Sequence, residues 1–188
     1  MERDARFVAK ARTALVLGGA RSGKSAFAQG LAEEAAPLRL YLATATASDA
    51  EMADRIARHQ ARRGEGWTTM EAPLELAETL ASNARGGQVV LVDCLTLWLA
   101  NLLLAGRDPE TEIGRLAEAV AALEGPAVLV SNEVGMGIVP ETRLGRDFRD
   151  WQGRANQEIA RVCSAVVLVA AGLPLFLKPA SRRPLELC

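Results

Sequence analysis

The sequence is poor in residue types that several classes of protein need. Aromatic residues make up 4% of its 188 residues, the formal net charge is −1, and no basic stretch is interleaved with aromatic side chains. Proteins that bind single-stranded nucleic acid combine a basic groove with aromatic stacking surfaces. The composition therefore argues against a nucleic-acid partner.

Cysteine is also scarce, and long apolar runs are missing. Cys94, Cys163 and Cys188 show neither paired spacing nor a metal-binding pattern, as expected in a reducing compartment. The longest apolar stretch, residues 95–105, is too short to span a bilayer and contains an asparagine. Residues 1–10 are charged and lack the apolar core of a signal peptide. We expect a cytoplasmic protein without a membrane span.

Apolar residues are abundant, at 49% of the chain, which is enough to bury the core of one domain over residues 1–188. Five apolar runs show no polar–apolar alternation, as expected for strands covered by helices on both faces. Because helical patterns lie between these runs, the sequence predicts an α/β fold, a mostly parallel central sheet flanked by helices. The runs are residues 14–17, 38–43, 89–92, 127–131 and 165–170.

Three segments between the runs carry helix signals. Residues 25–36 are expected to form the first helix. Ser48-Asp49-Ala50-Glu51 is a capping box that opens a helix to about Arg63. Asp108 supplies an N-cap with proline at the first helical position, and Gly125-Pro126 ends that helix.

The first apolar run is followed by a glycine-rich octapeptide with the spacing Gly-x4-Gly-Lys-Ser. Glycines let successive backbone N–H groups turn toward an anion, the lysine adds a positive charge, and the serine hydroxyl can bind Mg²⁺. The expected helix at residues 25–36 directs its N-terminal dipole at the same anion. The segment predicts a nucleotide-binding phosphate loop, with Ser25 as a metal ligand, made of Gly18, Gly19, Ala20, Arg21, Ser22, Gly23, Lys24 and Ser25.

Ligands of such sheets bind beyond the carboxyl ends of the strands, so the residues after each run are candidates for the site. Asp93 closes the third run, where an acidic residue can hold Mg²⁺ beside the phosphate loop. Aspartate also favours the helix N-cap, so a capping role for Asp93 is the alternative. Residues 131–140, after the fourth run, form either an ordered loop at the ligand edge or a plain strand-to-helix connection.

His59 is the single histidine of the chain and follows the second run. It shares a helix face with Met52 and Ile56, and this spacing favours a packed ring whose nitrogens are satisfied inside the protein. A neutral imidazole near a nucleotide can instead act as a base or a nucleophile. The same helix carries four arginines, which form a solvated face or help to neutralise phosphates. They are Arg55, Arg58, Arg62 and Arg63.

Four motifs together resemble one enzyme family, the bifunctional adenosylcobinamide kinase/adenosylcobinamide-phosphate guanylyltransferase of cobalamin biosynthesis. The likeness covers residues 14–178, and its specific part is Asn132–Glu141, because many unrelated enzymes share the phosphate loop. Arg58 stands where some relatives have a second histidine, and Gly64 where a proline is frequent. The motifs are Gly18–Ser25, Glu51-Met52-x2-Arg55-Ile56-x2-His59, Asn132–Glu141 and Phe148-Arg149-Asp150-x2-Gly153-Arg154-x-Asn156-Gln157.

The resemblance implies a RecA-like P-loop fold, usually assembled as a homotrimer, and two reactions. In the first, the γ-phosphate of ATP or GTP moves to the aminopropanol hydroxyl of adenosylcobinamide. In the second, GTP donates GMP to that phosphate through a GMP–histidine intermediate, and pyrophosphate leaves. Matched to this sequence, the histidine is His59 and the acidic strand end is Asp93.

Further nucleotide contacts are expected around the same site. Guanine presents two donors on its N1/N2 edge, so a carboxylate there would prefer guanine to adenine. Glu71 is our candidate, with a solvent-facing glutamate before a proline turn as the alternative. The remaining candidates follow the second run or flank its helix. They are Thr44, Ala45, Thr46, Arg62 and Arg63.

Two other functions stay open from the sequence. One is a single-activity P-loop kinase for a small molecule, in which His59 is structural. The other is a RecA-like nucleotide-dependent module that acts on a polymer or a partner. Residues 95–104 are apolar nearly all round, which predicts burial on several sides, by the domain or by a neighbouring subunit.

Overall fold

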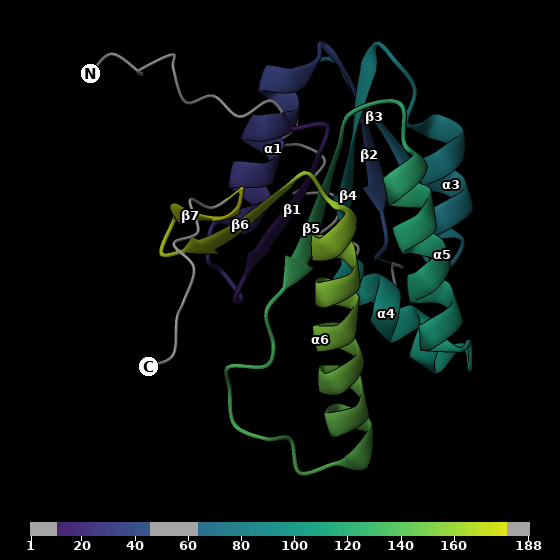
Figure 1. The fold of residues 1–188 in the computed structure, drawn as a ribbon, viewed down its shortest axis with the longest axis vertical. Helices are drawn as coiled ribbons and strands as arrows, with labels where there is room; N and C mark the ends of the chain where they lie inside the picture. The colour runs from purple at the N-terminus through teal and green to yellow at the C-terminus, as the bar shows by residue number, and fades with distance from the viewer. Residues whose placement is uncertain (1–10, 46–63, 180–188) are drawn as a thin grey trace, which may run out of the picture.

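The fold is that of a computed structural model, which describes residues 11–45 and 64–179. These residues form a seven-stranded sheet in the order β3-β2-β4-β5-β1-β6-β7 (Figure 1). All neighbouring strands are parallel except β6 and β7, which pair antiparallel. The strands are β1 (Thr13–Gly18), β2 (Leu38–Ala43), β3 (Trp67–Glu71), β4 (Gln88–Asp93), β5 (Ala127–Asn132), β6 (Ala165–Ala170) and β7 (Leu173–Lys178).

The five apolar runs are confirmed as β1, β2, β4, β5 and β6, and the mostly parallel α/β sheet is confirmed with them. Every residue of β1 is buried, as expected for a strand near the centre of the sheet. The sequence analysis missed β3 and β7, the two edge strands. Their residues are largely exposed, and β7 contains Pro174, which weakens a strand signal.

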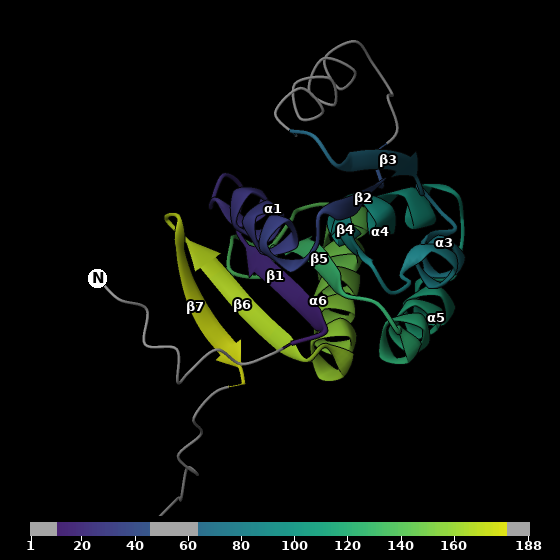
Figure 2. The same cartoon turned by 90° about the horizontal axis from the view of Figure 1, so that it is seen from above.

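Helices cover both faces of the sheet, and each face has its own core. Helix α1 (Lys24–Ala35) packs on one face, over a cluster that includes Val16, Val128 and Val130. Figure 2 shows α1 and α6 on opposite sides of β1 and β5. The larger core lies on the second face. Its helices are α3 (Leu76–Asn83), α4 (Leu95–Leu104), α5 (Pro109–Ala122) and α6 (Arg143–Val162).

The helix signals that fall on described residues are confirmed. Helix α5 begins after Asp108, whose side chain accepts a hydrogen bond from Thr111 N, and it ends just before Gly125-Pro126. The Thr111 hydroxyl donates to the same carboxylate, and the hydrogen bonds from the hydroxyl and from the backbone N–H together lower the pKa of Asp108 below its ordinary value. The capped helix expected at residues 48–63 lies outside the described residues.

The apolar composition of helix α4 is explained by its burial in the core. Leu95, Trp98, Leu99 and Leu102 are almost fully buried within the chain, so the domain core accounts for most of the burial that the sequence predicted. Leu104 is the exception, because 81% of it is exposed. The expectation of burial on several sides is therefore met largely inside one subunit.

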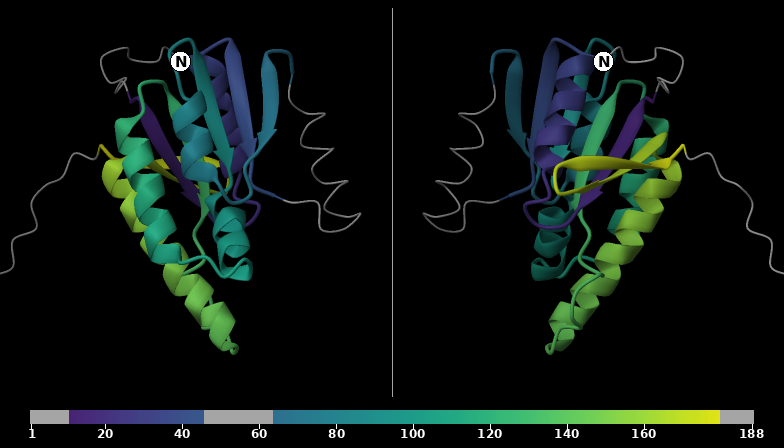
Figure 3. Two further views of the ribbon diagram at one scale, coloured as in Figure 1. Left: turned by 90° about the vertical axis from the view of Figure 1, so that its right-hand side faces the viewer. Right: turned by 90° about the vertical axis from the view of Figure 1, so that its left-hand side faces the viewer.

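The loop between β5 and α6, together with the start of α6, projects beyond the carboxyl edge of the sheet (Figures 1 and 3). Thr142 caps α6 by accepting a hydrogen bond from Gly145 N, and Arg146 donates to the Pro140 carbonyl oxygen at 3.1 Å. These contacts hold the end of the loop against the start of α6, and a role of residues 131–140 in ligand binding stays a prediction. Its large apolar side chains are exposed, namely Met136, Ile138, Val139 and Leu144.

No helix in residues 11–45 or 64–179 is long and apolar enough to cross a membrane. Cys94 and Cys163 are buried free thiols. Burial, together with the negative charge of Asp93, raises the pKa of the Cys94 thiol, so this group stays protonated at neutral pH.

Candidate functional site

Four candidate residues stand at the same edge of the sheet. The register pairs Ala43 of β2 with Glu71 on one side and with Asp93 on the other. It also pairs Asn132 of β5 with Gly18, where the phosphate loop begins. Because β5 lies between β4 and β1, the end of β5 separates Asp93 from the phosphate loop. The strand ends therefore line up along one edge of the sheet, as expected for parallel strands.

These side chains also lie on the same face of the sheet. Successive residues of a strand point to opposite faces. Leu91 of β4 and Val130 of β5 belong to the core under α1, so two residues further on Asp93 and Asn132 point to the α1 face as well. The same alternation from Trp67 brings Glu71 to that face. The start of α1, which carries Lys24, therefore shares its face with the three polar strand ends.

The phosphate loop requires its first and last glycines. A Cβ on Gly18 would lie 2.4 Å from Ser22 Oγ and 2.5 Å from the Val169 carbonyl oxygen, so no larger residue fits. Gly23 has φ +94°, in the left-handed region that glycine tolerates best. Gly19, Ala20 and Arg21, at the tip of the loop, are exposed to solvent.

Lys24 is ready to receive an anion. The residue is only 9% exposed, and its Nζ donates to the Gly19 carbonyl oxygen at 3.1 Å. A neutral carbonyl only partly compensates a buried ammonium group, since buried charges are normally paired. A phosphate bound in the loop would supply the missing opposite charge. Lys24 is also the first residue of α1, whose N-terminus attracts anions.

Ser25 and Asp93 fit a magnesium site in their chemistry. Ser25 is in the first turn of α1 and Asp93 ends β4 on the α1 face, and both offer oxygen ligands of the kind that Mg²⁺ prefers. The Tyr41 hydroxyl donates to Asp93 Oδ2 at 3.2 Å, which helps to orient the carboxylate. The alternative of a helix cap is not supported, because the N-cap of α4 is Cys94 and no side chain caps that helix.

Thr44 is fully buried and its hydroxyl is already engaged. It donates to the Cys94 carbonyl oxygen at 2.7 Å and accepts from Cys94 N at 2.8 Å. Asn101 Nδ2 donates to the Thr44 carbonyl oxygen at 2.8 Å. Thr44 therefore ties the end of β2 to the backbone next to Asp93. The hydroxyl therefore keeps one acceptor lone pair and has no donor left for a nucleotide, and nucleotide binding by Thr44 and Ala45 stays a prediction.

A buried polar network beneath the strand ends was missed by the sequence analysis, which noted the α6 motif without assigning a role to it. Ser131 Oγ donates to Asn156 Oδ1 at 2.6 Å, and Gln152 Nε2 donates to Ser131 Oγ at 2.9 Å. Asn156 Nδ2 donates to the Asn132 carbonyl oxygen at 3.1 Å. The signal in the sequence was a pair of amides four residues apart, Gln152 and Asn156, in a helix that is otherwise rich in charge.

Several predicted site residues lie apart from this cluster or outside the described residues. Glu71 is exposed at the end of edge strand β3, four strand spacings or roughly 19 Å from β1. A bound nucleotide would therefore have to extend across the ends of the strands to contact both Glu71 and the phosphate loop. Thr46, His59, Arg62 and Arg63 lie outside the described residues, so their roles stay predictions.

Comparison with known families decides the family of the chain. The model of the family described as cobinamide kinase / cobinamide phosphate guanyltransferase matches residues 14–177. The chain belongs to this family. The match includes the phosphate loop, Asp93 and the projecting loop, which confirms the resemblance that the sequence motifs indicated.

Curated relatives of this cobinamide kinase / guanyltransferase family member are similar along almost their whole length. The bifunctional adenosylcobalamin biosynthesis protein CobP of Pseudomonas aeruginosa is 51% identical, over 87% of this chain and 96% of that protein. The bifunctional adenosylcobalamin biosynthesis proteins CobU of Escherichia coli and Salmonella typhimurium are each 41% identical, over 87% of this chain and 98% of those proteins.

Solved structures show the fold alone. The ATPase EscN from the enteropathogenic E. coli type III secretion system matches with a TM-score of 0.57 at 10% identity, over 86% of this chain and 43% of that ATPase. Another solved structure, of a prototypical ATPase from the type III secretion system of pathogenic bacteria, matches with a TM-score of 0.50 at 9% identity, over 84% of this chain and 50% of that chain. The family member therefore has the α/β fold of P-loop ATPases, as the RecA-like prediction expected.

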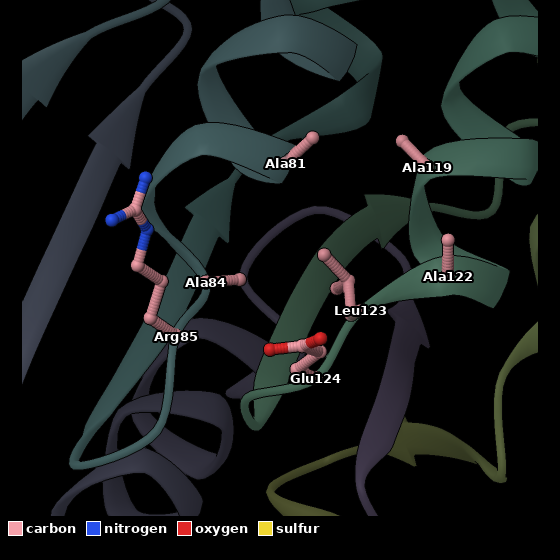
Figure 4. A pocket seen from close by; sticks show the side chains of 7 residues that line it. All are labelled: Ala81, Ala84, Arg85, Ala119, Ala122, Leu123 and Glu124. Atoms are coloured by element: carbon pink, nitrogen blue, oxygen red, sulfur yellow. The ribbon is translucent and has the colours of Figure 1, made fainter.

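One pocket of this family member, about 400 Å³ in volume, lies near the amino ends of the strands, opposite to the candidate site (Figure 4). It is lined by the ends of α3 and α5, including Arg85 and Glu124, which precede the first residues of β4 and β5. Strands of six residues separate it from the phosphate loop by roughly 20 Å. It is therefore no part of the candidate site.

Proposed function

We propose that this chain catalyses both reactions of its family: phosphorylation of adenosylcobinamide by ATP or GTP, and transfer of GMP from GTP to the resulting phosphate. The observation that carries the proposal is the meeting of a phosphate loop, a cationic Lys24 and an acidic strand end on one face of the sheet, in a member of this family. The substrates are a nucleotide and a corrinoid, with no nucleic-acid partner.

The kinase step needs positioning and charge neutralisation more than covalent chemistry. The aminopropanol oxygen attacks the γ-phosphorus, the bond from that phosphorus to the β–γ bridging oxygen breaks, and the hydroxyl proton is released. The loop N–H groups and Lys24 bind the phosphate oxygens, and the α1 dipole supports the developing negative charge. Bound Mg²⁺, held by Ser25 and Asp93, would supply further neutralisation of the triphosphate.

The guanylyl step is assigned to His59. An imidazole nitrogen attacks the α-phosphorus of GTP, a nitrogen–phosphorus bond forms, and pyrophosphate leaves. A phosphate oxygen of adenosylcobinamide phosphate then attacks the same phosphorus and displaces the imidazole. Support comes from chain connectivity, because the segment that carries His59 follows β2, which ends beside Asp93 at the site edge. Arg62 and Arg63 follow His59 closely enough in sequence to help neutralise the phosphates.

Glu71 is proposed to select guanine in this step. Its carboxylate ends β3 on the face that carries Lys24 and Asp93, and it is exposed to solvent. An ionised carboxylate accepts hydrogen bonds and cannot donate them, so it prefers guanine, which presents two adjacent donors at N1 and N2, to adenine, which presents an acceptor at N1 beside its N6 donor. The distance from β1 suits a base at one end of an extended nucleotide and phosphates at the other.

We also propose that the enzyme is a cytoplasmic homotrimer. Two buried free thiols suit a reducing compartment. The projecting loop exposes Met136 and Ile138, at 81% and 97% of their surface, and large apolar side chains gathered on one surface are typical of a subunit interface. Sedimentation at micromolar concentration should give three times the mass of the chain, and a monomer would contradict the trimer.

A labelling experiment tests the proposed function as a whole. The purified protein is incubated with GTP labelled at the α-phosphate, without a corrinoid, and then precipitated in acid and in alkali. A phosphoramidate predicts label that stays on the protein in alkali and is lost in acid. Addition of adenosylcobinamide phosphate should move the label to adenosylcobinamide-GDP. Absence of label on protein that phosphorylates adenosylcobinamide would leave a single-activity kinase.

A further inference from the structure

Asn132 is a polar strand end that neither the phosphate loop nor the magnesium pair uses. Its side-chain oxygen Oδ1 is buried and has no hydrogen-bond partner among the described residues. Buried polar atoms are nearly always paired, so an orphaned one needs an explanation such as a missing ligand. The position of Asn132, between Gly18 and the strand that carries Asp93, indicates which ligand this is.

The backbone N–H and carbonyl groups of Asn132 are both hydrogen-bonded, whereas its side-chain oxygen is not. Its N–H donates to Thr96 Oγ1 at 2.8 Å, and its carbonyl oxygen accepts from Asn156 Nδ2 at 3.1 Å. The next residue, Glu133, donates its N–H to the Gly18 carbonyl oxygen at 3.1 Å. Helix α4, helix α6 and the phosphate loop therefore fix this strand end from three directions, which is the support that a binding side chain needs.

The buried network behind Asn132 strengthens that support. Ser131, Gln152 and Asn156 hydrogen-bond one another on the α6 face, with all three side chains buried. Because strand residues alternate, Ser131 is directed to α6 and Asn132 to the α1 face, where the loop and Lys24 lie. A polar network under β5 thus anchors one face of the strand end and leaves the other face for a ligand.

A second orphaned group lies next to this one. Ser22 Oγ, in the phosphate loop, is buried without a hydrogen-bond partner among the described residues, and it would lie 2.4 Å from a Cβ on Gly18. Gly18 is the register partner of Asn132. Two unsatisfied polar groups of neutral side chains therefore flank the start of the loop, where a bound triphosphate would bring oxygen acceptors and associated hydroxyl or water donors.

We propose that the Asn132 carboxamide contacts the terminal phosphate of the bound triphosphate and is a catalytic residue of the kinase step. The carboxamide has one acceptor and two donors, so its N–H groups can bind a γ-phosphate oxygen while its oxygen accepts from the attacking hydroxyl. A half-turn of the amide exchanges the two ends without moving the backbone. This inference rests on the proposed kinase activity and adds a residue that distinguishes a bound triphosphate from a diphosphate.

The test compares binding of a triphosphate with binding of a diphosphate. Calorimetry with Mg²⁺ and either the β,γ-imido analogue of ATP or ADP gives the two affinities for the wild-type protein and for Asn132→Ala. Loss of a hydrogen bond to a charged group predicts a fall of about tenfold or more for the triphosphate analogue, with ADP unchanged. The turnover number for adenosylcobinamide phosphorylation should fall with it.

Two further variants keep the result interpretable. Asn83→Ala removes another partly buried asparagine, which donates to the Thr79 carbonyl oxygen at 2.7 Å at the far edge of the sheet, and it should leave both affinities unchanged. Asn132→Asp keeps the shape and places a negative charge near the γ-phosphate, so it should weaken the triphosphate analogue even more than alanine does. If Asn132→Ala does not fold, Asn132→Asp alone decides.

Equal losses for ADP and the triphosphate analogue, or no loss for either, would overturn the contact. The outcome is separate from that of the proposed function, because phosphorylation of adenosylcobinamide by the wild-type protein is measured first. A protein that binds nucleotide and lacks this activity would overturn the proposed function while the affinity ratio still tests Asn132.

Discussion

Gly172 N donates to the Ser22 carbonyl oxygen at 2.8 Å and so ties the turn between β6 and β7 to the phosphate loop. A Cβ on Gly23 would lie 3.1 Å from Gly172 Cα, so the close approach of the turn leaves little room for a side chain at Gly23. The loop is therefore braced by an antiparallel edge hairpin that is remote in sequence. A braced loop presents its N–H groups to phosphate without further ordering, which favours binding.

Lys24→Ala should lower the catalytic efficiency of adenosylcobinamide phosphorylation about a hundredfold to a thousandfold, because one preorganised charge contact to the transferring phosphate is lost. Lys178→Ala is the matched control. Its ammonium group also binds carbonyl oxygens, those of Ala160 and Arg161 at 3.1 and 2.9 Å, but on the edge strand β7. Steady-state kinetics of both variants check the prediction, and near-normal activity of Lys24→Ala would refute the phosphate-loop assignment.

Asp93→Asn should raise the Mg²⁺ concentration needed for half-maximal turnover and lower the maximal rate, because an amide carries no charge to neutralise the metal. The fold should persist, since the N-cap of α4 is Cys94. Asp108→Ala is the contrasting variant, because Asp108 does cap a helix, α5. We expect it to lower the melting temperature and to leave the Mg²⁺ dependence unchanged. A lower melting temperature for Asp93→Asn without a change in Mg²⁺ dependence would show that Asp93 has a structural role and does not bind the metal.

His59→Asn should abolish labelling by α-labelled GTP and formation of adenosylcobinamide-GDP, because asparagine cannot form the phosphoramidate. Phosphorylation of adenosylcobinamide should largely remain, since that phosphate moves directly to the substrate hydroxyl. Arg58 cannot replace the histidine, because a guanidinium keeps its proton at working pH. Label retained on His59→Asn protein would show that another group is the nucleophile.

Glu71→Gln should reduce the preference for GTP over ATP in the guanylyl step about tenfold or more, because a charged acceptor for the guanine N1/N2 edge is lost. Competition between labelled GTP and unlabelled ATP measures that preference. Glu65→Gln removes an exposed carboxylate that precedes the other end of β3 and serves as the control. An unchanged preference in Glu71→Gln would support the solvent-facing alternative.

Alkaline pH should destabilise the protein through Cys163. Burial raises the pKa of this thiol to about 11 from an ordinary value of 9.0, so the unfolded chain loses the proton first. Its contribution to stability is therefore complete below pH 9 and is lost as the pH rises toward 11. The difference in unfolding free energy corresponds to about 3 kcal/mol at most.

Urea unfolding at pH 8 and pH 10.5 checks this expectation. Cys163→Ala should be less stable than the wild-type protein at pH 8, because a buried side chain is truncated. It should also lose less stability between the two pH values, since it has no thiol to ionise at that position. Equal losses in the two proteins would assign the alkaline destabilisation to other groups.

The sequence alone indicated the strands that lie inside the sheet. β1 and β5 are buried on both faces, so hydrophobic burial leaves uninterrupted apolar runs that need no knowledge of the neighbours. Caps and turns are equally local, which is why the sequence predicted the Asp108 cap correctly and why glycine stands at Gly23, where φ is positive. These features follow from interactions within a few residues of chain.

The two edge strands, β3 and β7, could be recognised only in the tertiary structure. β3 and β7 each pair with one neighbour and leave most residues exposed, so burial imposes only a weak pattern on their sequences. The place of β5 between β4 and β1 is likewise invisible in a linear sequence, because crossover connections separate strand order in space from order along the chain.

The tertiary structure also decided which polar residues meet. Asn132 comes beside Gly18 only because β5 inserts next to β1, and it is supported by Asn156 only because α6 returns across the sheet. The sequence determined the chemistry that the chain can offer, a loop for phosphate and an acidic strand end, through local rules. Strand pairing and helix packing, which join residues more than a hundred positions apart, decided where that chemistry is assembled.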